Sequence, residues 1–108
     1  MADHLGLDDD AWTQCFQSRF GPEPWLKPYT DKLVLSRAPA GEDLLVACPG
    51  FLADCLETLD EIGLELAHAY SEAGGGQLRL VPCLNDSPAL TEALADVVAA
   101  HVAALAPA

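Results

Sequence analysis

The chain has 108 residues, of which 51% are hydrophobic and 6% aromatic, so it is long enough for one domain with an aliphatic core and too apolar for a disordered tail. Asp+Glu number 17 and Lys+Arg 5, and the formal net charge of -12 excludes nucleic-acid binding by release of counterions from phosphates. The charge suits a cationic partner or a metal ion, and it is equally well explained by solubility or by a salty or acid-rich setting.

Targeting and redox features are few. No basic segment followed by an apolar run opens the chain, and Pro, Gly or charged residues interrupt the apolar segments before the roughly 18 residues that a membrane span needs. We therefore expect a cytoplasmic protein without a transmembrane segment. No C-x-x-C pair occurs among the cysteines, so we expect them to be reduced and buried, with no iron–sulfur cluster; they are Cys15, Cys48, Cys55 and Cys83.

The N-terminal residues are polar and acidic and have no periodic pattern, which predicts a loose leader over residues 1–11 ahead of one domain over residues 12–108. The run that follows Trp12, TQCFQSRF, is rich in β-compatible residues and predicts a first strand. Pro24, Trp25 and Pro28 then predict a short helix that fades near Ser36.

The central segment contains the strongest signals. LLVAC, residues 44–48, is a continuous apolar run typical of a buried strand. A long helix is predicted from about Leu52 to Ala73, ended by three glycines, and QLRLVPCL predicts a third strand. The expected buried stripe of the helix is Leu52, Leu56, Leu59, Ile62, Leu66 and Tyr70.

A last helix begins at Pro88 with Ser87 as its cap. Its expected buried stripe is Leu90, Leu94, Val97, Val98, Val102 and Leu105. The order β-α-β-α-β-α predicts an α/β fold, a three-layer α/β/α arrangement around a small parallel sheet.

Three unusual loops follow the predicted strands, and in an open parallel sheet ligands bind outside the carboxyl ends of the strands. The loops group a possible site of seven residues: Gln17, Ser18, Trp25, Asp54, Glu57, Asn85 and Asp86.

Four carboxylates of the long helix, Asp54, Glu57, Glu61 and Glu65, are three, four and four residues apart and form an acidic ladder on one helical face. At about 100° per residue this face is opposite the leucine stripe, so periodicity alone favours a solvated surface.

The sequence motifs around the ladder point to a family more specifically than the ladder does. CPGF (residues 48–51), DCLETL (54–59), PCLNDSP (82–88) and FQSRFGPEPWLKPYTD (16–31) together resemble the C-terminal part of ferrochelatase, the enzyme that inserts ferrous iron into protoporphyrin in haem biosynthesis. The resemblance implies an incomplete C-terminal domain of a chelatase-like fold. It also implies that the ladder lines a porphyrin pocket between two halves of the enzyme.

By this resemblance, Glu57 is the catalytic glutamate that contacts the metal and accepts protons. Asp54, Glu61 and Glu65 match the acidic positions thought to relay protons or metal. Gln17, Ser18 and Trp25 match porphyrin-binding positions, although Trp25 fits an ordinary helix anchor equally well. Arg19 fits either a porphyrin propionate or a local carboxylate, and Asn85 and Asp86 suit a turn better than ligands.

The family's catalytic histidine comes from an upstream strand, and His4, His68 and His101 all lie outside its motif. The resemblance therefore implies a ferrochelatase fragment that needs the N-terminal part of the enzyme, with Fe²⁺ as substrate and no required cofactor. We expect the chain alone to be inactive or nearly so, and to be poorly stable or self-associating because a gap in a parallel sheet leaves backbone groups unpaired.

Two other hypotheses remain. One is a half-sized metal chelatase that works as a homodimer, which the absent histidine ligands disfavour. The other is a non-catalytic remnant that binds porphyrin or another protein.

Overall fold

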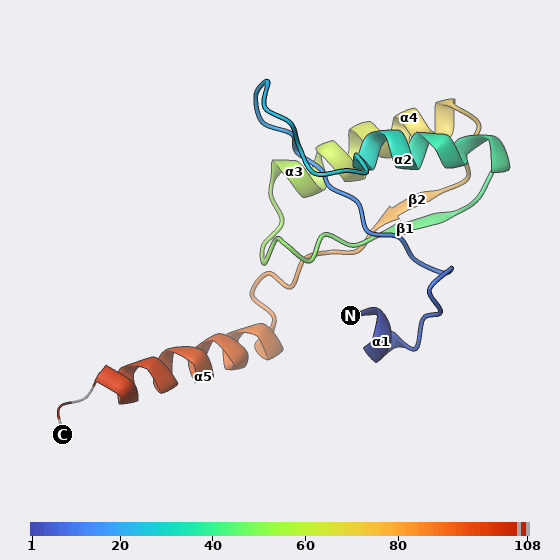
Figure 1. The fold of residues 1–108 in the computed structure, drawn as a ribbon. Helices are drawn as coiled ribbons and strands as arrows, with labels where there is room; N and C mark the ends of the chain where they lie inside the picture. Colours follow the sequence, from blue (N-terminus) through green and yellow to red (C-terminus); the bar gives the residue numbers. More distant parts are fainter. Residues whose placement is uncertain (106, 108) are drawn as a thin grey trace.

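A computed structural model describes residues 1–105 and 107 (Figure 1). Its extents are 63 × 37 × 24 Å, because the last helix projects away from the rest of the chain. In chain order the elements are α1 (Ala2–Leu5), α2 (Thr30–Arg37), η1 (Ala38–Ala40), β1 (Leu44–Val46), α3 (Leu56–Leu59), η2 (Glu61–Leu66), α4 (Ala67–Glu72), β2 (Leu78–Leu80) and α5 (Pro88–Leu105).

The sheet has two parallel strands, β1 and β2, in which Leu44 pairs with Leu78 and Val46 with Leu80. Both strands lie inside predicted ones, so these two predictions are confirmed. The predicted first strand is wrong: within the described residues this segment makes only an isolated parallel bridge between Phe16 and Tyr29. One bridge cannot extend into a strand without a neighbour that continues the ladder of backbone hydrogen bonds.

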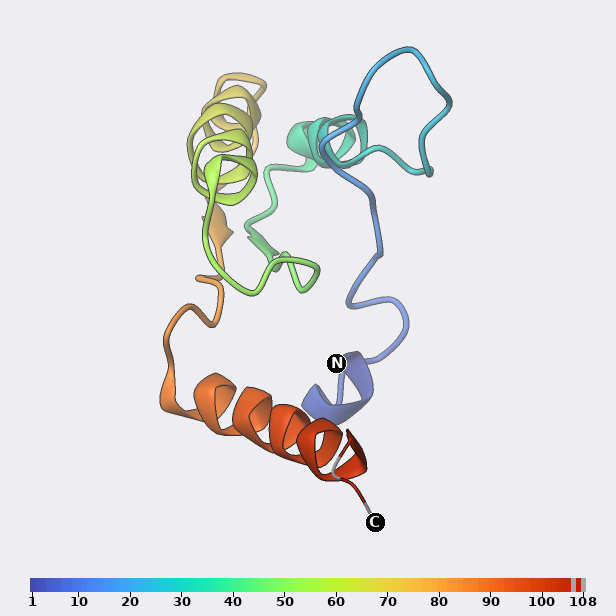
Figure 2. The same ribbon diagram turned by 90° about the vertical axis from the view of Figure 1, so that its left-hand side faces the viewer.

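The helices α2 and α3–η2–α4 lie side by side on the same side of the two strands (Figure 2). The small parallel sheet confirms a mixed α/β fold. The buried core lies between these helices and the strands and consists of Val34, Ala38, Cys48, Ile62, Leu66 and Tyr70.

The long predicted helix exists, but it begins at Leu56 rather than Leu52. Cys55 is its N-cap, and a capping box joins Cys55 to Thr58 in both directions. The segment Glu61–Leu66 is a π-helix, which is wider than an α-helix and usually spans a single turn.

The π-helix changes which side chains are buried. Ile62, Leu66 and Tyr70 lie in the core as predicted, but Leu56 is 77% exposed and Leu59 53% exposed. The predicted stripe is therefore wrong for its first half, including Leu52 at 52% exposed. Leu52 lies before the helix starts at Leu56, and a pattern built on 3.6 residues per turn loses its phase between Leu56–Leu59 and the core residues, where the wider turn is inserted.

The end of α4 is fixed by contact with the loop before β1. Tyr70 is fully buried, and its hydroxyl donates to the Glu42 carbonyl at 2.7 Å. A Cβ on Gly75 would lie 2.5 Å from the Tyr70 ring, and one on Gly76 would lie 2.7 Å from the Glu42 carbonyl oxygen. Glycine is needed at both positions because the chain passes too close for any side chain.

The segment predicted as a loose leader contains one helical turn, α1, and none of the residues of α1 is buried. One N-terminal prediction needs correction. The short helix starts at Thr30, well after Pro24, because the preceding segment is irregular and Tyr29 is the N-cap.

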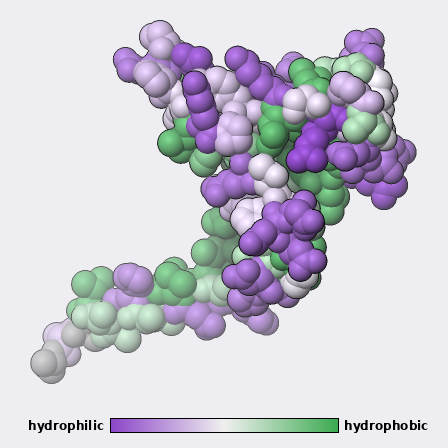
Figure 3. Space-filling view, turned by 45° about the vertical axis from the view of Figure 1, so that its right-hand side comes forward, coloured by the Kyte–Doolittle hydropathy of each residue, from purple (hydrophilic) through white to green (hydrophobic). Residues whose placement is uncertain are grey.

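Helix α5 begins at Pro88 with Ser87 before it, as predicted, but no residue of α5 is buried. Val98 and Val102 are each 60% exposed, and Figure 3 shows hydrophobic patches along the projecting helix. The prediction of a buried stripe is therefore wrong, because no other described element covers the helix.

By length and composition alone, α5 is also apolar enough to cross a membrane, with a mean hydropathy of 1.3 over 18 residues. The expectation that every apolar segment stops short of that length is corrected: alanines keep the window apolar despite Glu92 and Asp96.

Candidate functional site

Ser18, in the loop that follows Phe16, makes two hydrogen bonds to Glu61 of the acidic ladder, and this pair of bonds is called the clamp below. The backbone N–H of Ser18 donates to Oε1 of Glu61 at 3.0 Å, and the Ser18 hydroxyl donates to Oε2 at 2.6 Å. Both carboxylate oxygens of Glu61 therefore have a donor. Ser18 has a φ of 57°, in the left-handed region that non-glycine residues rarely occupy, so the clamp requires a strained backbone.

Gln17 connects the same loop to the segment after β1 and to α3. Its amide Nε2 donates to the Glu57 carbonyl at 2.7 Å, and the Cys48 thiol donates to its Oε1 at 3.1 Å. Its own carbonyl accepts the Trp25 indole N–H at 3.0 Å. Gln17 thus holds the indole and the first turn of the ladder helix together.

Asp54 is the most heavily bonded carboxylate of the ladder. Oδ1 accepts the Thr58 hydroxyl at 3.0 Å and the Cys83 N–H at 3.4 Å, and Oδ2 accepts Asn85 Nδ2 at 3.0 Å. These donors favour the ionised form, with the Asn85 side chain contributing most, so the pKa of Asp54 lies below its usual value.

Glu57 is half-buried one turn after Asp54. A hydrogen bond from the Cys55 thiol, followed by one from its own backbone N–H, lowers the pKa of Glu57 against a smaller opposing effect of burial. Glu57 is therefore a carboxylate at neutral pH.

The acidic ladder is not a uniformly solvated face. Asp54, Glu57 and Glu61 are half-buried, whereas Glu65 is exposed. The solvated face that periodicity favours is thus wrong for the first three members. These three residues lie against the loops at residues 17–18 and 85. Asp54 accepts a hydrogen bond from Asn85, the Glu57 carbonyl accepts one from Gln17, and the Glu61 carboxylate accepts one from Ser18.

The cysteines support this arrangement without pairing. All four are free, and Cys48 is buried while the other three are half-buried, so the prediction of full burial holds for one of them. Burial, with help from nearby thiols and Glu61, raises the pKa of Cys48 to about 11. Burial and the bond to Asp54 likewise raise the pKa of Cys83. Both are protonated thiols that act as hydrogen-bond donors.

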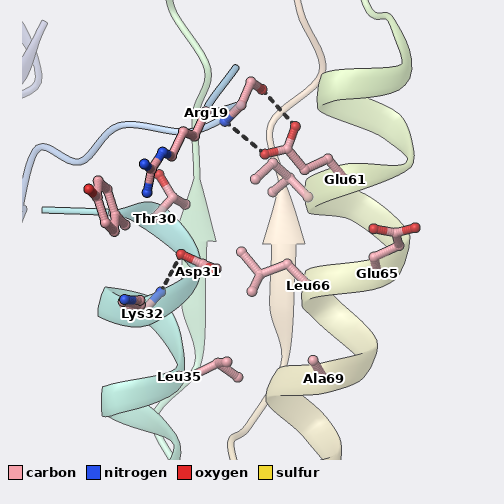
Figure 4. Close-up of a pocket in the computed structure, with 12 residues that line it drawn as sticks. Arg19, Thr30, Asp31, Lys32, Leu35, Glu61, Glu65, Leu66 and Ala69 are labelled. Carbon is pink, nitrogen blue, oxygen red and sulfur yellow. Dashed lines mark hydrogen bonds between the residues drawn. The ribbon is translucent and has the colours of Figure 1, made fainter. Parts of the chain in front are cut away.

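A hollow of about 500 Å³ opens beside the ladder, between α2 and η2 (Figure 4). Glu61 and Glu65 border it on one side and Asp31 and Lys32 on the other. The complete lining is Ser18, Arg19, Tyr29, Thr30, Asp31, Lys32, Leu35, Glu61, Ile62, Glu65, Leu66 and Ala69.

Positive charge gathers near this hollow in an otherwise acidic chain. Arg19, Lys27 and Lys32 place their charged groups 5.3–5.9 Å from the centre of the Tyr29 ring. Arg19 donates to the Pro22 carbonyl at 3.2 Å rather than to a local carboxylate.

Within residues 1–105 and 107, no three His, Cys, Asp or Glu side chains are placed to hold one metal ion together. His68 lies 3.3 Å from Glu72 on the exposed side of α4, and His101 contacts the Val97 carbonyl at 2.8 Å. A metal ion bound at Glu57 would therefore take its remaining ligands from water, from the substrate or from residues outside the described part of the chain.

The structure thus brings together most residues grouped from the sequence: Gln17, Ser18, Trp25, Asp54, Glu57 and Asn85, joined by Glu61. Asp86 is an exposed residue of the same turn as Asn85, and none of the side-chain hydrogen bonds described above involves it. The sequence missed Cys48 and Thr58 as supports of the site. The S/T-x-x-E/Q pattern that marks a capping box has no match at Cys55 and Thr58, so no simple signal pointed to them.

Comparisons with known proteins agree on one family. A family model described as ferrochelatase matches residues 1–102. A ferrochelatase of Polaromonas sp. strain JS666 is 48% identical over 104 residues, which cover 95% of this chain and 28% of the relative. A ferrochelatase of Pseudomonas putida strain F1 is 48% identical over 98 residues, and one of Brucella anthropi is 56% identical over 84 residues. The chain spans 24–29% of the length of these relatives.

Proposed function

The chain belongs to the ferrochelatase family, and we propose that it supplies the acidic-ladder half of a site that inserts ferrous iron into protoporphyrin. One observation carries the proposal: three carboxylates at the start of one helix, Asp54 just before it and Glu57 and Glu61 within it, lie half-buried against polar loops. The segments that hold Asp54 and its partner Asn85 follow the carboxyl ends of the two parallel strands. Such an edge is where open α/β sheets bind ligands.

The chemistry of insertion fits carboxylates. The macrocycle must lose two pyrrole protons, and the ferrous ion must shed water before four nitrogens surround it. Glu57 is ionised and half-buried, so it can accept a proton and offer a hard oxygen to the ion. We assign Glu57 both roles, with Glu61 and Glu65 as the next carboxylates along the helix toward the hollow.

Trp25 is the best candidate for contact with the macrocycle. Its indole is 39% exposed and is held by the bond from Nε1 to the Gln17 carbonyl, so it offers a fixed aromatic face. The side chains of Gln17 and Ser18 are already bonded within the chain, so in our proposal they shape the pocket edge and reach the porphyrin only if those bonds open.

The exposed area indicates that the site is shared. The chain exposes 8158 Å², whereas a compact monomer of its mass exposes about 5,800 Å². We propose that the N-terminal part of the enzyme covers the excess, completes the three-layer α/β/α arrangement and faces Glu57 across the pocket. In this proposal the isolated chain is nearly inactive, ferrous iron is the substrate, no cofactor is required, and the complete enzyme acts in the cytoplasm.

A chimera tests the proposal. The 104 matched residues of the Polaromonas ferrochelatase are replaced by their equivalents from this chain, and the insertion of ferrous or zinc ion into protoporphyrin is followed by absorbance. We expect the chimera to be active, Glu57→Gln to abolish activity, and Glu72→Gln to preserve it, because the Glu72 side chain is 71% exposed on α4.

Equal activity of the Glu57 and Glu72 variants would overturn the assignment of Glu57. Metal insertion by the isolated chain, lost in Glu57→Gln, would keep the site and refute the need for a second half.

A further inference from the structure

The turn that follows β2 makes contacts that a turn alone does not need. Asn85 Nδ2 donates to Asp54 Oδ2 at 3.0 Å and to the Cys83 carbonyl at 3.1 Å, and Asn85 Oδ1 accepts the Asp54 N–H at 2.9 Å. The Asn85 N–H donates to the Leu52 carbonyl at 2.9 Å. Both ends of the carboxamide and its backbone donor are therefore used.

The orientation of this carboxamide follows from its partners. A backbone N–H requires an acceptor, and a carbonyl and a carboxylate require donors, so only one of the two amide orientations satisfies Asp54 and Cys83 together. The contact also joins segments 31 residues apart in the chain. It ties the loop after β2 to the start of the ladder helix.

We propose that Asn85 is a positioning residue, which grips Asp54 at its backbone N–H and its carboxylate and so fixes where the ladder helix begins. Asp54 lies just before the N-cap Cys55, and Thr58, which donates to Asp54, is fully buried. Movement of Asp54 would therefore shift the first turn, which carries Glu57.

The same contacts change the part that Asp54 plays. With Asn85, Thr58 and Cys83 all donating to it, Asp54 is a fixed acceptor rather than a carrier that exchanges protons with its neighbours. The ladder then has one anchoring carboxylate, Asp54, followed by the three that our proposed function uses. This inference rests on that function for its purpose, but the contact itself can be tested without porphyrin or metal.

Two substitutions of Asn85 separate positioning from turn formation. Its φ is 51°, a conformation that glycine adopts without strain. Asn85→Gly therefore keeps the turn and removes the carboxamide. Asn85→Asp keeps an acceptor for the Asp54 N–H but places a second carboxylate against Asp54 in place of the donor.

The test is NMR-detected hydrogen exchange at the Asp54 amide in the 108-residue chain and both variants. We expect Asn85→Gly to speed this exchange about fivefold, the loss of one ordinary hydrogen bond. Asn85→Asp should be destabilised at pH 7 and recover near pH 3, where a protonated carboxyl can again donate. Exchange in Asn85→Gly within twofold of the parent, with Val81 still protected by its bond to Val46, overturns the proposal.

Acid unfolding provides a second measurement, which also serves if one variant folds poorly. Stability linked to ionised Asp54 is present above its ordinary pKa of 3.8 and is lost as the pH falls through the lowered pKa. Positioning predicts that the deficit of Asn85→Gly shrinks on acidification, and a turn role predicts a constant deficit. A constant deficit would refute positioning, whereas a failed chimera assay with normal exchange data would refute only the proposed function.

Discussion

Replacing Ser18 by Ala removes one bond of the clamp on Glu61 and leaves the other. The hydroxyl bond at 2.6 Å is lost, while the bond from the Ser18 N–H at 3.0 Å remains. A hydrogen bond to a charged group contributes roughly 1.5–3 kcal/mol when well protected. Both residues are half-exposed, so solvent screening reduces the expected loss in free energy of unfolding to about 1 kcal/mol.

Replacing Ser18 by Gly removes the same hydroxyl but also removes the strain of a left-handed backbone conformation. A left-handed residue other than glycine carries about 1–2 kcal/mol of strain, and glycine gives back about 0.4–1 kcal/mol through the greater freedom of the unfolded chain. With φ at 57°, Ser18→Gly should therefore be more stable than Ser18→Ala by about 0.5–1 kcal/mol.

The assay is urea unfolding followed by tryptophan fluorescence, because the Trp25 indole is bonded to the neighbouring Gln17 carbonyl. A double-mutant cycle of Ser18→Ala with Glu61→Gln should give a coupling free energy near 1 kcal/mol. The bond between Ser18 and Glu61 is refuted if this coupling free energy lies within about 0.3 kcal/mol of zero, which is the limit of additivity for independent sites. The strain argument is refuted if the Gly variant is the less stable of the two.

Two more predictions concern the core. Gly75→Ala should lower the free energy of unfolding by about 1–3 kcal/mol in urea titrations, because its Cβ would overlap the buried Tyr70 ring. The control is Gly50→Ala, which should change the free energy of unfolding little because no atom lies within 4 Å of the added Cβ. Equal effects of the two substitutions would contradict this packing. The protonated Cys48 thiol stabilises the fold fully below the ordinary pKa of 9.0, and this contribution should be lost as the pH rises toward about 11. Cys48→Ala should lose that alkaline decline, and a decline of equal size in the variant would count against it.

The sequence predicts where the helices and strands of this chain occur better than it predicts which of their side chains are buried. The two apolar runs that become β1 and β2, the long helix and the Ser87–Pro88 start of α5 are all local signals, and each is present. The first strand is reduced to one bridge because a strand depends on neighbours that local sequence does not report.

The acidic ladder shows why the site was harder to predict. The resemblance pointed to its residues, but periodicity assigned the whole ladder to solvent, since it assumed one uninterrupted α-helix. The π-helix at Glu61–Leu66 and the start at Leu56 break that assumption. The contacts of Asn85 and Cys48 depend on loop conformation. From residue type alone, we could predict only that Asn85 lies in a turn and that Cys48 is a buried thiol.

Helix α5 has a consequence for how this chain will respond to heat and denaturant. None of its 18 residues is buried, so packing against the core does not stabilise it. We therefore expect α5 to unfold by gradual fraying, separately from the cooperative unfolding of residues 30–81. Circular dichroism, which sums all helices, and tryptophan fluorescence should then give non-coincident melting curves. A second protein that covers α5 would bring the two curves together, and that coincidence would be a direct signal of assembly.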